Sequence, residues 1–211
     1  MRTVKEAEER KNEILDAAEE LFVTKGYDKT STGDILDKVG IARGTLYYHF
    51  KSKEDILDAM IERISASMMV RAKAEAANTE LSVIERIIRS VMSLKLQSPI
   101  GDEILQQVHK PQNALMHSKM QKNMIDSVVP LLAGLVEEGV KQGIFDTPYP
   151  FYAAEMIIVY SEFAFDEEQD RTQEELMTGI QAFIHNTEKI LGAESGSLTQ
   201  PMMMFFSQSD R

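Results

Sequence analysis

The sequence of 211 residues predicts an all-α protein. Apolar residues recur at three- and four-residue spacing along most of the chain, which is the pattern of an amphipathic helix. Capping residues precede these stretches and Gly or Pro follows them, while no stretch alternates apolar and polar residues as a half-buried strand does. We expect an N-terminal three-helix domain over residues 1–52, a larger helical domain over 53–192 and a flexible tail over 193–211.

Two helices open the N-terminal domain. The first begins near Thr3, with Glu6 as a capping-box acid, and ends at Gly26. The second begins at Ser31, where an acid follows three residues later, and ends at Gly40. Apolar residues at helical spacing give both helices an inward face, so we expect them to pack together.

The third helix, within residues 40–53, carries the most informative pattern. Leu46 and Phe50 are spaced to face inward, and the outward positions hold Arg, Gly and Tyr residues. Arg can fork onto guanine or phosphate, Gly lets the backbone approach, and Tyr hydroxyls can reach phosphate. A short helix, a Gly-containing turn and this second helix form a helix-turn-helix, whose second helix reads the DNA major groove.

The remaining helices are predicted from the same signals. Pro130 lies inside one of them, where we expect a kink. The last helix starts at a capping box of Thr172 and Glu175 and ends at Gly192. The other predicted ranges are 52–76, 80–97, 102–109, 114–142 and 150–165.

Several residues of the N-terminal domain occur in an order typical of one family. They are Ile14 to Phe22, Gly26-Tyr27, Thr30-Ser31 and Gly44-Thr45-Leu46-Tyr47-Tyr48-His49-Phe50-Lys51-Ser52-Lys53-Glu54. With them, the first quarter of the chain resembles the DNA-binding domain of TetR-type transcriptional regulators. Leu36 and Val39 depart from the small alanines usual in that family, and Ala42 stands where a serine often caps the recognition helix.

The resemblance implies double-stranded DNA as a partner. Although the net charge of the chain is −11, residues 38–53 contain lysine and arginine and no acid, and a local field of this kind steers a protein onto phosphate. The alternative is that this exposed face is merely solvated. The expected DNA-binding residues are Thr32, Arg43, Gly44, Thr45, Tyr47, Tyr48, His49 and Lys53.

The two last helices are expected to form a dimer interface. The helix over 150–165 is apolar nearly all round, so it must be buried on two sides. Resemblance to TetR-type regulators implies the same homodimer, formed by the last two helices. The alternative is that both are core helices of a monomer. The expected interface residues are Ile157, Ala164, Leu176, Ile180, Phe183, Ile184 and Leu191.

The resemblance also implies a cavity for a small, largely apolar effector among the middle helices. Methionine is flexible and suits a pocket for varied apolar ligands, although Met at helical spacing is more often ordinary core. The expected lining residues are Met92, Leu96, Met116, Met120, Met124, Val128, Met156 and Tyr160. Glu155 and Glu162 have three interpretations: recognition of a cation, a hydrogen bond across a dimer, and a solvent-facing edge.

Other functions are disfavoured by what the sequence lacks. It has no cysteine, and hence no disulfide and no thiolate metal site. It has no Gly-rich phosphate loop, Gly-x-Ser-x-Gly elbow or His-Glu-x-x-His pair, so we expect no catalytic residue, no metal and no cofactor. Its start reads as a charged helix and no apolar run is long enough to span a bilayer, so we expect a cytoplasmic protein without a membrane partner.

The sequence therefore predicts a DNA-binding transcriptional regulator that responds to a ligand. Its simplest form is a repressor that binds a palindromic operator as a homodimer and is released when an effector shifts the equilibrium between two spacings of the recognition helices. The alternative is a helical enzyme or small-molecule binding module that kept the fold without operator control. A third possibility is a member of the family without any small-molecule effector.

Overall fold

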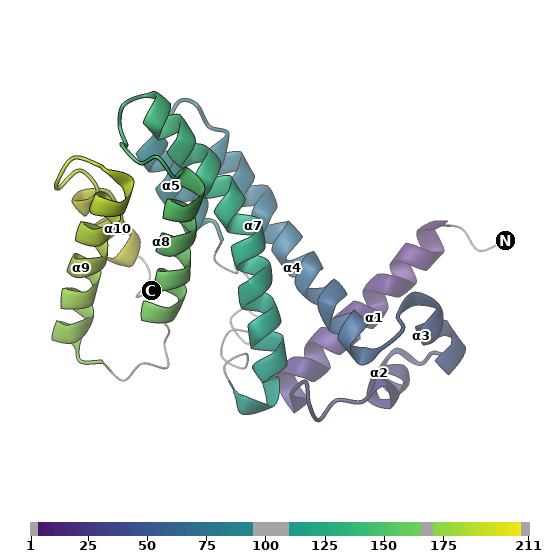
Figure 1. Ribbon diagram of the computed structural model, residues 1–211. Coiled ribbons are helices and arrows are strands. Elements are labelled where there is room, and N and C mark those ends of the chain that lie inside the picture. The colour runs from purple at the N-terminus through teal and green to yellow at the C-terminus, as the bar shows by residue number, and fades with distance from the viewer. Residues whose placement is uncertain (1–3, 95–109, 166–170, 208–211) are drawn as a thin grey trace. The chain divides into compact units, whose positions relative to one another are not determined.

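The computed structural model describes residues 4–94, 110–165 and 171–207 (Figure 1). All regular structure in these residues is helical, which confirms the all-α prediction. The helix predicted over 102–109 lies outside the described residues. The elements are α1 (Val4–Lys25), α2 (Thr32–Val39), α3 (Arg43–His49), α4 (Lys53–Ala76), α5 (Val83–Met92), the 3-10 turn η1 (Pro111–Asn113), α7 (Ala114–Lys141), α8 (Pro150–Ala164), α9 (Gln173–Leu191) and α10 (Thr199–Ser207).

The predicted caps define the bounds of α2 and α9. Ser31 Oγ accepts the N–H of Asp34, and the Asp34 carboxylate accepts the N–H of Ser31, so α2 begins with a reciprocal capping box. Thr172 and Glu175 form the same box before α9. Both helices end at the predicted glycines, which have φ angles of 71° and 62°.

Helix α5 is shorter than the predicted range of 80–97. Ser82 and Glu85 form a capping box at its start, so the N–H groups of the first turn are satisfied from residue 82 onward. Ser93 closes the other end, where its N–H bonds to the carbonyl of Arg89 at 2.9 Å. The capping residues therefore set both bounds of this helix.

The described parts of Met1–Ala66 and Leu96–Asn123 form one compact unit. Its core joins α1, α2 and α3 to the first half of α4 and the start of α7. Ile56, Leu57 and Met60 of α4 have no exposed surface, so the unit extends beyond the boundary predicted at residue 52. The largest fully buried apolar members of this core are Ile14, Phe22, Ile35, Leu46, Ile56, Leu57, Met60 and Met116.

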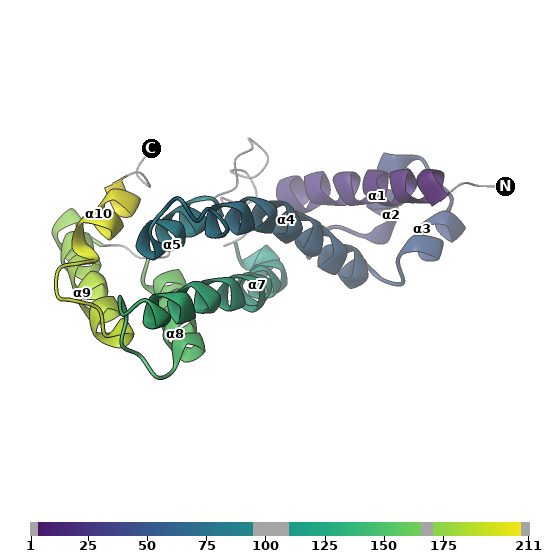
Figure 2. The ribbon, with the colours of Figure 1, turned by 90° about the horizontal axis from the view of Figure 1, so that it is seen from above.

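The described parts of Ser67–Lys95 and Met124–Arg211 form a second compact unit. One apolar cluster joins the end of α4 with α5, α7 and α8 around Ala72, Val129 and Leu132. Another joins α5, α7, α8, α9 and α10 around Phe183 and Ile184. Helices α8 and α9 pack side by side, and α10 lies against α9 (Figures 1 and 2).

Residues 199–207 form a packed helix within the segment for which the sequence predicted a flexible tail. Helix α10 packs against α5 and α9, with Met202 buried and Phe206 on the same apolar cluster. The turn before α10 is held by the buried carboxylate of Glu188, which accepts the N–H groups of Gly196 at 2.9 Å and Leu198 at 3.0 Å. The prediction is therefore wrong for these residues.

Candidate nucleic-acid interface

The turn between α2 and α3 has the conformation that a helix-turn-helix requires. The N–H groups of Gly40 and Ile41 both bond to the carbonyl of Leu36, at 2.8 and 3.2 Å. Gly40 has a φ of 71°, a left-handed conformation that costs glycine little. The chain therefore leaves α2 and enters α3 through a short, hydrogen-bonded turn.

Helix α3 presents the two faces expected from its sequence. Leu46 and the C-cap residue Phe50 are buried in the core of the first unit. On the opposite side, Tyr47 exposes 41% of its surface and Tyr48 78%. The exposed residues of the outward face are Arg43, Gly44, Tyr47 and Tyr48.

The exposed face of α3 contains a linked polar group. The guanidinium carbon of Arg43 lies 5.5 Å from the ring centroid of Tyr47, one turn later. Hydrogen bonds from the side chains of Thr32 and Arg43 lower the pKa of the Tyr47 hydroxyl. Thr32 is the first residue of α2, so the group links the starts of both helices. A forked guanidinium and hydroxyls are the donors that bond base edges and phosphates.

The other predicted contact residues of α3 lie at different depths. The exposed ring of Tyr48 packs edge-on against the half-buried ring of His49, with centroids 4.9 Å apart. Thr45 is half-buried, and Gly44 has open space where a Cβ would stand. The N-cap residue Ala42 makes no side-chain hydrogen bond, as expected from the missing serine.

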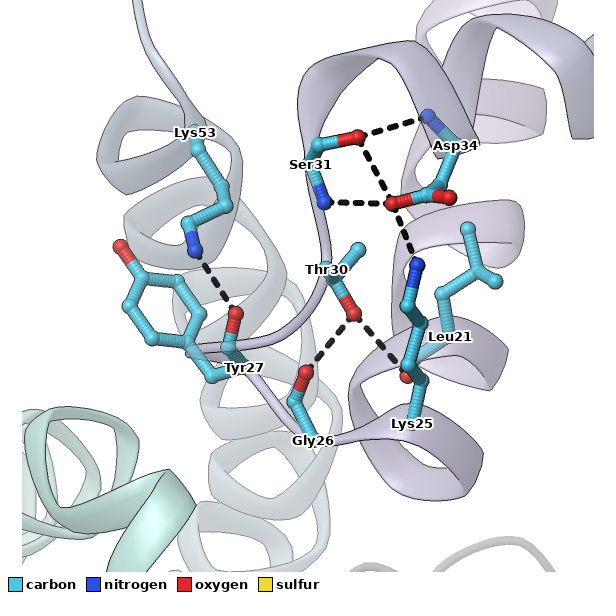
Figure 3. Close-up of polar contacts among 8 residues, drawn as sticks. All are labelled: Leu21, Lys25, Gly26, Tyr27, Thr30, Ser31, Asp34 and Lys53. Atoms are coloured by element: carbon cyan, nitrogen blue, oxygen red, sulfur yellow. Dashed lines mark hydrogen bonds and ion pairs between the residues drawn. The ribbon is translucent and has the colours of Figure 1, made fainter.

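Lys53 is held within the protein, which disagrees with the phosphate contact predicted for it. Its Nζ donates to the carbonyl of Tyr27 at 2.7 Å and lies 4.1 Å from the centroid of the same ring (Figure 3). Partial burial lowers the pKa of the ammonium. Both residues of this contact belong to the first unit, so Lys53 connects the start of α4 to the turn after α1.

Two further cations near the recognition helix are paired with acids. Lys38 Nζ lies 2.6 Å from Glu20, and Lys25 Nζ lies 2.7 Å from Asp34 (Figure 3). Hydrogen bonds from Lys25 and Ser31 hold the pKa of the Asp34 carboxyl well below its usual range. Of the cations in residues 38–53, Lys38, Arg43 and Lys51 are exposed, and Lys38 is paired with Glu20.

Most residues predicted for the dimer interface pack inside their own chain. Phe183 is only 6% exposed and contacts the rings of Phe165 and Phe206, at centroid distances of 5.3 and 6.2 Å. Side chains buried this deeply in their own chain leave little surface for contact with a second copy. The buried residues are Ala164, Ile180, Phe183, Ile184 and Leu191, while Ile157 and Leu176 are half-buried on the same cluster.

The outward face of α8 carries exposed apolar side chains that the sequence did not predict as part of an interface. Tyr152 exposes 62% of its surface and Met156 58%. Val159 and Tyr160 continue this face, and Met177 of α9 is exposed as well. We call Tyr152, Met156, Val159 and Tyr160 the α8 outer face. Glu155 lies beside it and is half-buried, while the side chain of Glu162 is outside the described part of the chain.

The residues predicted to line a ligand pocket belong to different apolar clusters. Val128 and Met124 belong to the apolar cluster of α4, α5, α7 and α8. Met116 and Met120 belong to the core of the first unit, and Met92 is half-buried. Of the remaining three predicted residues, Met156 and Tyr160 are exposed, and Leu96 lies outside the described residues.

The described residues contain neither a metal site nor a membrane-spanning helix. No group of three or more His, Asp or Glu there is arranged to hold a metal ion. None of the helices that the structure describes is long and apolar enough to cross a bilayer.

Comparison with known proteins bears on both parts of the chain. Residues 14–60 match the model of bacterial regulatory proteins of the tetR family, and residues 99–186 match the tetracyclin repressor-like C-terminal domain. The chain is 33% identical over 105 residues to the HTH-type transcriptional regulator AcrR of Shigella flexneri, and 31% identical over 80 residues to TtgR of Pseudomonas putida.

These two stretches cover 48% and 38% of this chain, and 47% and 38% of the relatives, so less than half of either relative is matched. A crystal structure of a TetR-family transcriptional regulator from Pectobacterium atrosepticum extends the likeness. It superposes with a TM-score of 0.62 at 25% identity, over 90% of this chain and 98% of that one.

Proposed function

Because the chain belongs to the TetR family of bacterial transcriptional regulators, we propose that it is a repressor that binds a palindromic operator as a homodimer and is released by a small effector. The observation that carries the proposal is the linked group of Arg43, Tyr47 and Thr32 on the exposed face of α3. It offers forked and hydroxyl donors on a short helix that follows a fixed turn, as major-groove readout needs.

In this proposal the residues of α3 divide into two roles. Arg43 stands at the start of the helix and reads a base edge, since its guanidinium can donate two parallel N–H bonds. Tyr47, Tyr48 and His49 contact the phosphate backbone, which fixes the register of the helix without reading sequence. The exposed Lys51 takes the place of Lys53 as the phosphate-binding cation.

The proposed homodimer pairs the α8 outer face with the same face of a second copy. A contiguous exposed apolar surface of this kind marks an interaction site. A two-fold contact is self-complementary, so one apolar face suffices for both subunits. The two recognition helices would then meet half-sites whose centres lie about 34–36 Å apart or a multiple of that spacing.

The proposed effector is small and largely apolar. The cluster of α4, α5, α7 and α8 that contains Met124 and Val128 supplies apolar side chains from several helices, and methionine adapts its shape to a ligand. An effector preferring one conformation of the second unit would shift the population away from the DNA-binding form. The proposal also places the protein in the cytoplasm, together with its DNA.

The proposal is tested by selecting duplex DNA from a random pool with the full chain. We expect enrichment of one palindrome, occupied by two chains in sedimentation of the complex. Enrichment of a single unpaired half-site would contradict the dimer, and no enrichment at all would favour the helical enzyme or binding module. A thermal-shift screen of small apolar compounds then tests the effector, since a true effector raises the melting temperature and lowers operator affinity.

A further inference from the structure

A fully buried polar side chain outside the helix-turn-helix contacts the turn that precedes it. Asn113, in η1 just before α7, has no exposed surface. Its Oδ1 accepts the backbone N–H of Tyr27 at 2.6 Å, across 86 residues of sequence. Tyr27 lies between α1 and α2, so this bond joins the start of α7 to the turn between the first two helices.

Further contacts hold the turn between α1 and α2 close to η1. The N–H of Asp28 bonds to the carbonyl of Gln112 at 3.1 Å, directly beside the Asn113 bond. Gly26 has a φ of 89°, and a Cβ built there would lie 2.6 Å from Gln112 Cγ, so a larger residue would be strained and would displace the Gln112 side chain. Three consecutive residues of the turn, 26–28, therefore lie against η1.

Two further contacts fasten the start of α7 to the first unit. Met116 is fully buried in its core. Lys119 Nζ lies 2.9 Å from Glu54 and 2.6 Å from Asp58 of α4, and hydrogen bonds to these carboxylates raise the pKa of the ammonium. We call residues 111–119 the docking segment, because each of these contacts attaches it to the α1–α4 part of the unit.

The turn held by the docking segment leads directly into the DNA-facing helices. The carbonyl of Tyr27 accepts Lys53, so its peptide groups are fixed on both sides. The buried hydroxyl of Thr30 donates to the carbonyls of Gly26 at 2.7 Å and Leu21 at 3.2 Å (Figure 3). The next residue, Ser31, caps α2. Between the Asn113 contact and the first residue of α2, hydrogen bonds thus hold Tyr27, Asp28, Thr30 and Ser31.

We infer that Asn113 is a positioning residue for DNA binding, which sets the α1–α2 turn and through it the placement of α2 and α3. The inference rests on the proposed operator binding and adds a point of control to it. Helix α7 begins at the docking segment and continues into the second unit as one helix. A shift of α7 along or about its axis would therefore act on Tyr27 first, and on the recognition helix through it.

The test compares Asn113→Ala with Ser118→Ala, a control on the exposed side of the docking segment. Two quantities are measured on the full chain: affinity for the selected operator, and hydrogen exchange of the Tyr27 and Asp28 amides. In Asn113→Ala we expect operator affinity to fall about tenfold and both amides to exchange faster, because a buried donor loses its acceptor. Exchange of α9 amides should not change, which separates positioning from general destabilisation.

If Asn113→Ala binds the operator as tightly as Ser118→Ala does, the inference is overturned and the proposed function stays intact. If the wild-type chain selects no DNA, the proposed function fails. Independently of that result, an unchanged rate of hydrogen exchange at the Tyr27 amide in Asn113→Ala would overturn the inference. Should Asn113→Ala not fold, Lys119→Gln loosens the same segment from its exposed side, with Lys122→Gln as the charge-matched control. We expect Lys119→Gln to speed hydrogen exchange of the Tyr27 amide and to weaken operator binding, both more than Lys122→Gln does. If the two variants give the same exchange rate and the same operator affinity, the inference is overturned.

Discussion

Helices α3 and α8 both expose aromatic side chains, but the groups around those side chains differ. On α3, Tyr47 stands beside a guanidinium and a threonine hydroxyl, which suits a charged, hydrogen-bonding partner. On α8, Tyr152 and Tyr160 stand with Met156 and Val159, which suits another apolar surface. An exposed aromatic ring alone does not identify a partner. The donors and charges beside it do.

The largest expected effect distinguishes a substitution in the core behind α8 from one on the α8 outer face. Phe183→Glu places a charge in the core of the second unit and should lower the free energy of unfolding by about 3–5 kcal/mol. Met156→Glu, on the exposed face, should give a folded monomer. Urea denaturation and sedimentation velocity measure the two outcomes. A folded, monomeric Phe183→Glu would return the interface to α9.

The next effect concerns the polar face of α3. Arg43→Ala should cost about 1–3 kcal/mol of discrimination between the operator and unrelated DNA, because the forked donor to a base edge is lost. Both affinities are measured at one fixed salt concentration. Equal losses on the two DNAs would show that Arg43 contacts phosphate and would remove its base-reading role.

A smaller effect distinguishes an exposed cation from an internal one. Lys51→Ala should reduce the slope of log affinity against log salt by about one unit, as loss of one phosphate contact does. Lys53→Met should leave that slope unchanged, since the ammonium of Lys53 is bound to Tyr27. Titrations with operator DNA at several salt concentrations measure both slopes. A reduced slope in Lys53→Met would mean that Lys53 leaves Tyr27 to bind phosphate.

The smallest effect concerns the charge at the start of α2, for which the α8 outer face has no counterpart. The folded protein holds the pKa of Asp34 below its ordinary value, chiefly through Lys25 and Ser31. Its contribution to stability is therefore complete above the unfolded pKa of about 4 and declines as the pH falls from there towards the lower pKa of the folded state. The melting temperatures of wild type and Asp34→Asn should differ most at pH 7, and the difference should narrow as the pH is lowered below about 4. Asp37→Asn, on the same helix, is the control for the loss of one negative charge.

The sidedness of α3 could be predicted because its apolar and polar residues are separated at helical spacing. The caps of α2 and α9 could be predicted because Ser31 and Thr172 act within four residues of sequence. The sequence of α8 contains no such contrast, since nearly all of its side chains are apolar. The predicted interface consequently fell on side chains such as Phe183, which complete the core of the same chain.

Two other features escaped prediction because they depend on contacts distant in sequence. The bond from Tyr27 to Asn113 joins residues 86 apart, and no local pattern relates them. Helix α10 lacks a strong capping signal, and its order comes from packing against α5 and α9. Tertiary packing of this kind decides the conformation of short segments whose own helix propensity is weak.

The stacking of Arg43 on Tyr47 also affects the entropy of association. A free arginine samples many rotamers, and fixing such a side chain on binding costs about 0.5–1.5 kcal/mol. In this protein the ring of Tyr47 already restricts the guanidinium, and Tyr47 is in turn bonded to Thr32. Part of the restriction of the Arg43 side chain thus occurs during folding, before DNA binds. The recognition helix reaches its target with less disorder to lose.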